Sequence, residues 1–253
     1  MGNNTILIKS DKEIELMLEG GKKLARVKNK LIEAIKIGVT AADIENLATD
    51  LIEKEGGKPS FKMVSEYHWS TCVNINEGVV HGIPKPEIVF KSGDVVSIDV
   101  GMFFRGFHTD TSYTVGLDVD EGIKKFLKAG ETTLNNAVTK TKKGARIYDI
   151  SQAIQDSLVP YGYNPVKVLV GHGIGRNLHE DPQIPGIVIG DREDSPVIPE
   201  GATFAIEIIY SMGEPEIELG KDGWTLSMRD GKISALYEET VAVTKKGTIV
   251  LTR

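Results

Sequence analysis

The strongest constraint on the fold is an internal repeat that covers much of the chain. The segment KIGVTAADIENLATDLIEKEG aligns with KKGARIYDISQAIQDSLVPYG at one constant offset, so that Gly38 matches Gly144 and Asp43 matches Asp149. This period is far longer than the unit of a solenoid, which has about 20 to 50 residues. The sequence therefore predicts two related half-domains.

A second pattern follows the aligned segment in each half. It consists of a His-Gly-Ile triplet, a glycine-led apolar strand that ends in a carboxylate, and a carboxylate shortly before a threonine. The copies are His81–Ile83, Gly93–Asp99 and Asp110-Thr111, and then His172–Ile174, Gly201–Glu207 and Glu238–Thr240. Carboxylates with imidazole suit divalent transition metals, and paired carboxylates can bridge two ions. This recurrence predicts a metallohydrolase.

The setting of each carboxylate supports a site. Asp99 ends an apolar run, where a buried carboxylate is unfavourable without a charged partner or a metal, and Glu207 repeats this setting. Asp110 lies across a predicted hairpin from Asp99, so the two can converge, although taken alone it would equally suit the surface. Glu238 repeats the position of Asp110, and Glu239 is expected on the opposite face of its strand.

Three histidines lie in glycine- or acid-rich contexts. His172 lies in GHGIG, which lacks the GxGxxG spacing of a nucleotide loop, and we expect its neutral imidazole to bind metal. His81 and His179 are candidates only jointly with it, since a lone histidine is more often structural and no HExxH helix surrounds His179. His68 and His108 are expected to be structural or surface groups.

Cys72 is the only cysteine, which excludes an intramolecular disulfide framework and a cysteine-rich zinc site. A nucleophilic thiol paired with His81 is conceivable, but no cysteine-protease signature surrounds Cys72. We expect a small packed thiol near the site.

Charge and hydropathy bound the partners. The net charge of −6 argues against a general nucleic-acid-binding surface. No apolar run approaches the roughly 18 residues of a spanning helix, and the first residues do not resemble a signal peptide. We expect a cytoplasmic protein without a membrane or specific nucleic-acid partner. A local basic cluster is interpreted as the solvated face of a helix: Lys22, Lys23, Arg26, Lys28 and Lys30.

Hydrophobic periodicity predicts helices over residues 11–37, 40–56, 121–139 and 147–160, the first with a capping box at Ser10 and Glu13. Strands are expected over 72–76, 95–104, 107–115, 166–170, 203–210 and 236–243, with a tight turn at Arg105-Gly106. We therefore expect one α+β catalytic domain over residues 1–253 with internal pseudo-twofold symmetry, its half-repeats spanning roughly 10–116 and 117–245.

Over nearly its whole length the chain resembles the type I methionine aminopeptidases, which form subfamily A of peptidase family M24 and have the creatinase-like pita-bread fold. It is similar to their short, bacterial form, without the additional N-terminal domain of proline-specific relatives or the long insertion of type II enzymes. The matching motifs are CVNINEGVVHGIP at 72–84, GDVVSIDVG at 93–101, FHTDT at 107–111, GHGIG at 171–175, HEDPQIP at 179–185, KDGWT at 221–225 and YEET at 237–240.

The resemblance implies an enzyme that removes the initiator methionine from nascent proteins whose second residue is small. Such an enzyme would contact the ribosome transiently, and we expect a monomer. The implied cofactor is a pair of divalent ions, of Co, Mn, Fe(II) or Zn. The implied ligands are Asp99, Asp110, His172, Glu207 and Glu238, with Asp110 and Glu238 bridging.

The resemblance also assigns catalytic and substrate-binding roles. Glu207 would shuttle a proton, and His81 and His179 would contact the substrate and assist catalysis. The methionine side chain needs an apolar slot, for which the resemblance suggests four residues. They are Cys72, Tyr67, Trp224 and Leu178.

Three positions depart from the family pattern. Val64 replaces an aromatic residue before Cys72, Ile208 replaces the usual proline, and Glu239 replaces the usual histidine. None removes an implied ligand, but an extra acid beside the site can alter metal affinity. Two alternatives stay open: a proline-specific peptidase of the same fold, and a non-catalytic ribosome- or RNA-associated binding protein.

Overall fold

Ten strands from both halves of the chain form one antiparallel sheet in the computed structural model, which describes residues 5–253. The main path runs β1 (Lys58–Pro59), β4 (Val95–Phe104), β5 (Phe107–Gly116), β12 (Ser234–Thr244), β9 (Thr203–Ser211), β7 (Val170–Gly173) and β8 (Glu180–Pro185). Three further strands pair beside this path: β2 (Thr71–Ile75) with β4, β6 (Asn164–Pro165) with β9, and β13 (Gly247–Val250) with β12. A separate small sheet joins β10 (Ile217–Leu219), β11 (Leu226–Met228) and β3 (Gly78–Val80).

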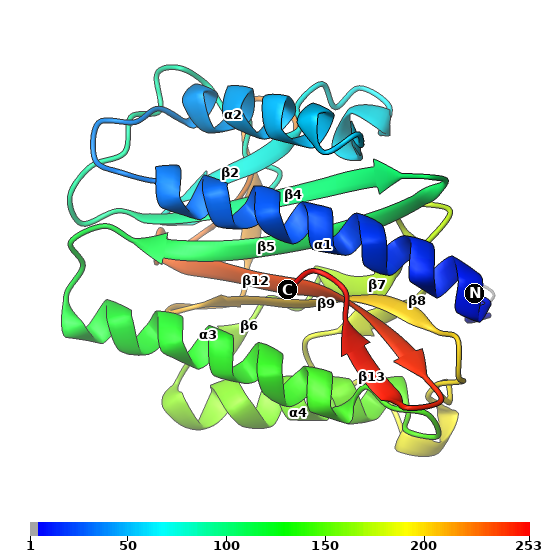
Figure 1. The fold of residues 1–253 in the computed structure, drawn as a ribbon. Helices are drawn as coiled ribbons and strands as arrows, with labels where there is room; N and C mark the ends of the chain where they lie inside the picture. The colour runs from blue at the N-terminus through cyan, green and yellow to red at the C-terminus, as the bar shows by residue number, and fades with distance from the viewer. Residues whose placement is uncertain (1–4) are drawn as a thin grey trace.

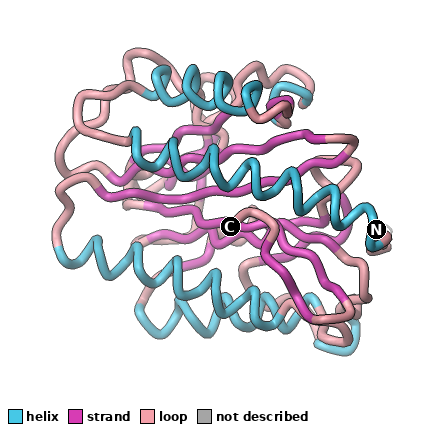
Figure 2. Tube along the Cα trace, in the orientation of Figure 1, coloured by secondary structure: helices cyan, strands magenta, loops and turns pink. Residues whose placement is uncertain are grey.

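In residues 5–253, the helices α1 to α4 pack on the sheet, two from each half of the chain, as Figures 1 and 2 show. The first-half helices α1 (Asp11–Ala34) and α2 (Ala41–Lys54) share a core with β4, whereas α3 (Glu121–Lys140) and α4 (Ile147–Leu158) share one with β9 and β12. Short 3₁₀ turns lie at Phe61–Met63, Val159–Tyr161 and Arg192–Asp194. The order of two helices followed by strands thus occurs twice. None of the helices among the described residues is long and apolar enough to cross a bilayer.

Local sequence signals explain where most of these elements begin and end. The capping box predicted at Ser10 and Glu13 is present and starts α1. The helix ends at Ala34, before the predicted residue 37, because Ile35 already has an extended backbone and Gly38 turns the chain at a φ of +88°. The predicted Arg105-Gly106 turn is also confirmed, since both residues have positive φ and join β4 to β5.

One strand prediction was wrong. Residues 166–170 do not form one strand. Val166 still donates a backbone hydrogen bond to Ile209 of β9, and Val170 is already the first residue of β7. Between them Val168 is 70% exposed, so the apolar run does not pack as a strand. The short strands β1, β3, β6, β8, β10, β11 and β13 were not predicted, and most of them are too short for period-two alternation to be visible.

Within the large sheet, the two halves meet at a narrow contact between β5 and β12 that we call the central seam. Strands β4 and β5 pair along their whole lengths, and β12 pairs with β9 from residue 234 to residue 242. Across the seam, β5 pairs directly with β12 only where Ser112 faces Glu238 and Thr111 faces Glu239. This short register therefore fixes how side chains from the two halves are placed relative to one another across the sheet.

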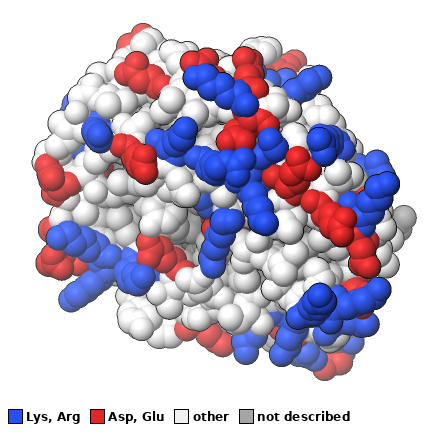
Figure 3. Space-filling view, in the orientation of Figure 1, with Lys and Arg blue, Asp and Glu red and all other residues white. Residues whose placement is uncertain are grey.

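Helix α1 lies over the seam, on the face of the sheet that is turned toward the viewer in Figure 1. Lysines and arginines gather over its outer face (Figure 3), as the sequence indicated, and Lys22, Arg26 and Lys30 are exposed. The interpretation was wrong for Lys28, which is only 5% exposed and points inward. It lies one helical turn from Leu24 and from Leu31, on the buried stripe of the helix.

Close packing of α1 against the C-terminal segment yields a stability prediction. A Cβ atom on Gly21 would lie 2.4 Å from the backbone oxygen of Leu251, so Gly21→Ala forces the two segments apart. We expect a loss of about 1 to 3 kcal/mol in the free energy of unfolding, measured by urea denaturation. Gly122→Ala in α3 is the control, because only the Asp120 carboxylate lies near that Cβ, and alanine favours the helix by up to about 1 kcal/mol. Equal stability of Gly21→Ala and wild type would contradict this packing.

Candidate metal centre

Five neighbouring strands each contribute one of the five predicted metal-ligating side chains. In sheet order, β4 carries Asp99, β5 carries Asp110, β12 carries Glu238, β9 carries Glu207 and β7 carries His172. The sheet brings together residues that are far apart in the sequence. It also draws them from both halves of the repeat around the central seam.

The strand register places all five on one face. Asp99 lies opposite Ser112, Ser112 opposite Glu238, and Glu238 opposite Glu207, so these residues form one row across four strands. Asp110 precedes Ser112 by two residues and therefore faces the same side. His172 lies opposite Ala205, two residues before Glu207, and also shares this face.

Distances within the cluster are those of a site that can hold cations. One ligand atom from each of Asp110, His172 and Glu238 lies within 4.8 Å of the other two. His172 Nε2 lies 3.4 Å from a carboxylate oxygen of Glu207. Asp99 Oδ1 and Glu238 Oε1 are buried without any hydrogen-bond partner. Buried oxygens of this kind are rarely left unpaired, and a metal ion would satisfy them.

Electrostatics point the same way. Burial raises the pKa of Asp99 to about 7, and burial together with the neighbouring carboxylates raises the pKa of Asp110, Glu207 and Glu238 well above the ordinary range. Four carboxylates cannot all be ionised in one small space without cations. The residues present therefore fit a centre of divalent ions bound by oxygen and imidazole.

His172 is held in the form that a metal requires. Its Nδ1 lies 2.7 Å from the carbonyl oxygen of Gly173, which can only accept, so Nδ1 carries the proton and Nε2 is free to bind a cation. Burial and the nearby His179 ring lower the pKa of His172 to about 4, which keeps the imidazole neutral. The cluster has one neutral donor beside its four acids.

Glu239 points away from the cluster, as strand alternation predicts. Its carboxylate lies on the helix side of the sheet, 3.0 Å from Lys28 Nζ and 3.1 Å from Arg253 Nε. The residue that departs from the family pattern is thus satisfied by other side chains and does not face the metal cluster.

The cluster lies at the base of a cavity of about 180 Å³ that all eleven predicted site residues line. Parts of His81 and His179 reach solvent at its rim, and His81 has an unusual backbone φ of +58°. Such a conformation is costly for a non-glycine residue and is found mostly at functional sites. The remaining predicted wall residues are Tyr67, Cys72, Leu178 and Trp224.

Aromatic and sulfur contacts order the apolar wall. The rings of Tyr67 and Trp224 meet edge to face with centroids 5.1 Å apart, and the Tyr67 hydroxyl lies 3.2 Å from the Cys72 sulfur. Burial and the nearby Asp99 raise the pKa of the Cys72 thiol, which keeps it protonated. A thiol in this form is a poor nucleophile, so Cys72 acts as a packed wall residue.

Sequence reasoning missed three residues beside the site. Phe61 and Val80 also line the cavity, but each lies in a short apolar stretch that carries no chemical signal. Ser112 completes the row between Asp99 and Glu238, and its buried hydroxyl has no partner. Its position two residues after Asp110 on a predicted strand was the signal that could have indicated it.

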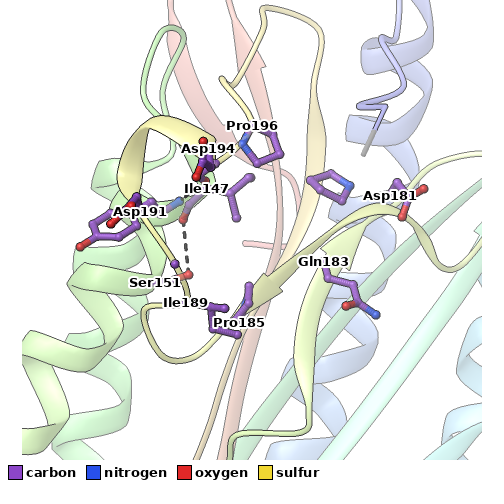
Figure 4. A pocket seen from close by; sticks show the side chains of 13 residues that line it. Ile147, Ser151, Asp181, Gln183, Pro185, Ile189, Asp191, Asp194 and Pro196 are labelled. Atoms are coloured by element: carbon purple, nitrogen blue, oxygen red, sulfur yellow. Dashed lines mark hydrogen bonds between the residues drawn. The ribbon is translucent and has the colours of Figure 1, made fainter. Parts of the chain in front are cut away.

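A larger hollow of about 400 Å³ lies away from this cluster, between α4 and the edge strand β8 (Figure 4). Its polar residues include Asp181, Asp191 and Asp194, and no histidine or cysteine lines it. The smaller cavity, which the predicted ligands and histidines line, is therefore the candidate site.

Known proteins that match nearly the whole chain include methionine aminopeptidases. Residues 15–245 match the sequence model of metallopeptidase family M24. The methionine aminopeptidase of Clostridium perfringens is 37% identical over 248 residues, covering 98% of either chain. The crystal structure of a methionine aminopeptidase from Thermotoga maritima matches with a TM-score of 0.95 at 39% identity, covering 98% of this chain and 100% of that one.

A prolidase from Pyrococcus furiosus matches with a TM-score of 0.77 at 22% identity, over 97% of this chain and 65% of that one, which shows a common fold alone. The expected pita-bread fold is therefore confirmed. By family model, sequence identity and structure, the chain belongs to metallopeptidase family M24 and, within it, to the methionine aminopeptidases.

Proposed function

We propose that this protein removes the N-terminal methionine from polypeptides whose second residue is small, using two divalent ions. The observation that carries the proposal is the cluster of four carboxylates and His172 on one face of the sheet, with buried oxygens of Asp99 and Glu238 left unpartnered. Methionine aminopeptidases that match nearly the whole chain support the choice of substrate. Metal identity is set by availability among Co, Mn, Fe(II) and Zn, all of which accept these ligands.

The proposed ligands are Asp99, Asp110, His172, Glu207 and Glu238. When bound, the ions would supply Lewis acidity toward the scissile carbonyl and would lower the pKa of a water molecule. Asp110 and Glu238 flank the central seam and come from different halves, which suits them to bridge two ions. Asp99 and Glu207 lie at either end of the row and suit one ion each.

Three side chains handle protons and orient the substrate. Glu207 is half-buried at the cavity base, and its raised pKa suits it to accept a proton from water and pass it to the leaving amine. Loss of solvent around their rings lowers the pKa of His81 and His179, so both are neutral and each keeps one N–H to donate. The ring centroids of His179 and His172 lie 4.6 Å apart, so His179 is placed to donate a hydrogen bond to the developing oxyanion. His81 would contact the scissile amide.

The apolar wall of the cavity would hold the methionine side chain. Its flexible thioether packs well against aromatic rings and sulfur, which Tyr67, Trp224 and Cys72 provide. Leu178 closes the wall beside His179, and Val64 leaves more space than an aromatic residue would. A cavity of about 180 Å³ suits a single side chain, and the adjoining hollow beside His81 and His179 leaves room for the rest of the peptide.

The proposal extends to the setting of the enzyme. We propose one catalytic domain built from half-repeats at roughly residues 10–116 and 117–245, acting in the cytoplasm as a monomer on nascent chains at the ribosome. The recurrence of two helices and strands in each half supports this division.

The first experiment tests the reaction itself. Metal-stripped protein receives Mn, Co, Fe(II) or Zn in turn, and free methionine released from a Met-Gly-Met peptide is measured. We expect metal-dependent release that falls to the metal-free level in Asp99→Asn, because that variant loses a ligand whose oxygen has no other partner. Cleavage of an Ala-Pro peptide alone would favour the proline-specific alternative. A folded protein that releases nothing with any metal would favour the binding protein.

Replacing the rim histidines should separate catalysis from metal binding. His179→Ala and His81→Ala remove groups that touch the substrate but are not among the proposed ligands. We expect turnover to fall about 10²- to 10⁴-fold, with bound metal unchanged by elemental analysis. Loss of metal in either variant would show that the histidine is a ligand.

The raised pKa of Asp99 predicts how stability depends on pH without metal. Between its usual value of 3.8 and about 7, the folded protein keeps a proton that the unfolded chain releases, so stability is lost as pH rises through this window. From about pH 5 to about pH 8, the metal-free wild type should therefore lose more thermal stability than metal-free Asp99→Asn. With added Mn²⁺, the wild type should be more thermally stable than Asp99→Asn at about pH 8, because the ion stabilises the ionised ligands. Parallel pH profiles of the two metal-free proteins would contradict this electrostatic account.

A further inference from the structure

Directly behind the proposed metal ligands, on the helix side of the sheet, lies a buried ion pair that the mechanism does not use. Lys28 of α1 and Glu239 of β12 lie 3.0 Å apart, and their side chains are only 6% and 7% exposed. Removing two charges from water is unfavourable unless both are well paired, so this pair needs an explanation.

The pair spans the central seam. Lys28 Nζ also donates to the hydroxyl of Thr111 on β5, at 2.9 Å, and that hydroxyl donates to the backbone oxygen of Glu238 on β12, at 2.8 Å. One lysine thus contacts both halves of the repeat. It does so at the two residue pairs where β5 and β12 are directly in register.

These contacts lie next to the proposed bridging ligands in the sequence and on the opposite face of the sheet. Thr111 follows Asp110 on β5, and Glu239 follows Glu238 on β12. Because side chains alternate along a strand, fixing Thr111 and Glu239 behind the sheet fixes the direction of Asp110 and Glu238 in front of it. Their separation depends on how closely the seam is held.

The Glu239 carboxylate is fully satisfied, in contrast to Glu238. Its Oε1 accepts from Lys28 and from Arg253, and its Oε2 accepts from the hydroxyl of Thr252. Glu238 Oε1 has no partner. The adjacent glutamates therefore have separate tasks: one anchors the strand, and the other is free for a cation.

We propose that Lys28 and Glu239 are positioning residues of the metal centre, which hold the central seam at the spacing that lets Asp110 and Glu238 share ions. The inference rests on the proposed function, since it takes Asp110 and Glu238 as ligands. Groups that orient metal ligands from behind typically contribute 10- to 100-fold to metal affinity.

The test measures Mn²⁺ binding to metal-stripped protein by calorimetry, at a temperature where circular dichroism shows every variant folded. Lys28→Met keeps the length of the side chain but removes its donors. Lys28→Met/Glu239→Gln removes both charges, so it has the same summed charge as the wild type and leaves no buried lysine or glutamate unpaired. A loss of affinity in this double variant reports geometry and not charge.

We expect Mn²⁺ affinity to fall about 10- to 100-fold in Lys28→Met and at least about 10-fold in the double variant. Two controls should stay within about twofold of wild type. Arg26→Met changes another residue of α1 and removes its exposed ion pair with Glu55, which follows α2. Phe126→Leu weakens the core under α3, away from the seam.

Three outcomes decide the matter. Wild-type affinity in the double variant would overturn the positioning role and leave Lys28 and Glu239 as a charge pair. Affinity losses in Phe126→Leu that equal those of the double variant would also overturn it, because general destabilisation would then suffice. Asp110→Asn distinguishes failure of the proposed metal site from failure of the positioning role. If this variant binds Mn²⁺ like the wild type, the proposed metal site is wrong. If it loses Mn²⁺ binding, the metal site stands, and the double variant alone decides the positioning role.

Discussion

The central seam between β5 and β12 is the constraint on which the rest of the structure depends. Direct strand pairing there is limited to Ser112 with Glu238 and Thr111 with Glu239, and elsewhere the halves pair only in the small sheet, through β3 and β11, among the described residues. Side-chain hydroxyls complete it. On one flank, Thr240 Oγ1 accepts from Asp110 N at 2.8 Å and donates to Asp110 O at 2.7 Å.

On the other flank, Thr114 Oγ1 makes the equivalent pair of bonds with the backbone of Leu236, at 3.0 and 2.7 Å. A backbone ladder would bring the strands together along their whole length, whereas single hydroxyls let them diverge on either side of the cluster. In this way the backbone groups of Asp110 and Leu236 are satisfied although the two strands do not pair at these residues. The threonines that follow the recurring acids, Thr111 directly after Asp110 and Thr240 two residues after Glu238, both form hydrogen bonds across the seam.

Much of this could be predicted from the sequence, because the repeat shows the same chemistry twice. The helices and long strands followed from periodicity, and the five clustered side chains followed from matching motifs. Lys28 was misplaced because a lysine among other lysines suggests a solvated face. Its spacing from Leu24 and Leu31 indicated the core, but a buried lysine is credible only with a partner, and Glu239 is too distant in the sequence to be identified as one. Tertiary pairing of charges, and the edge strand β8, lay beyond what local patterns encode.

The position of Glu239 also answers how an acid beside a crowded metal site can be tolerated. A further negative charge on the cluster side would add to the repulsion that already raises the pKa of Glu238, and it would compete for the same cations. On the helix side it pairs with two cations, Lys28 and Arg253. Paired with Lys28 and Arg253 on the helix side, Glu239 is therefore kept apart from the proposed metal ligands on the other face of the sheet.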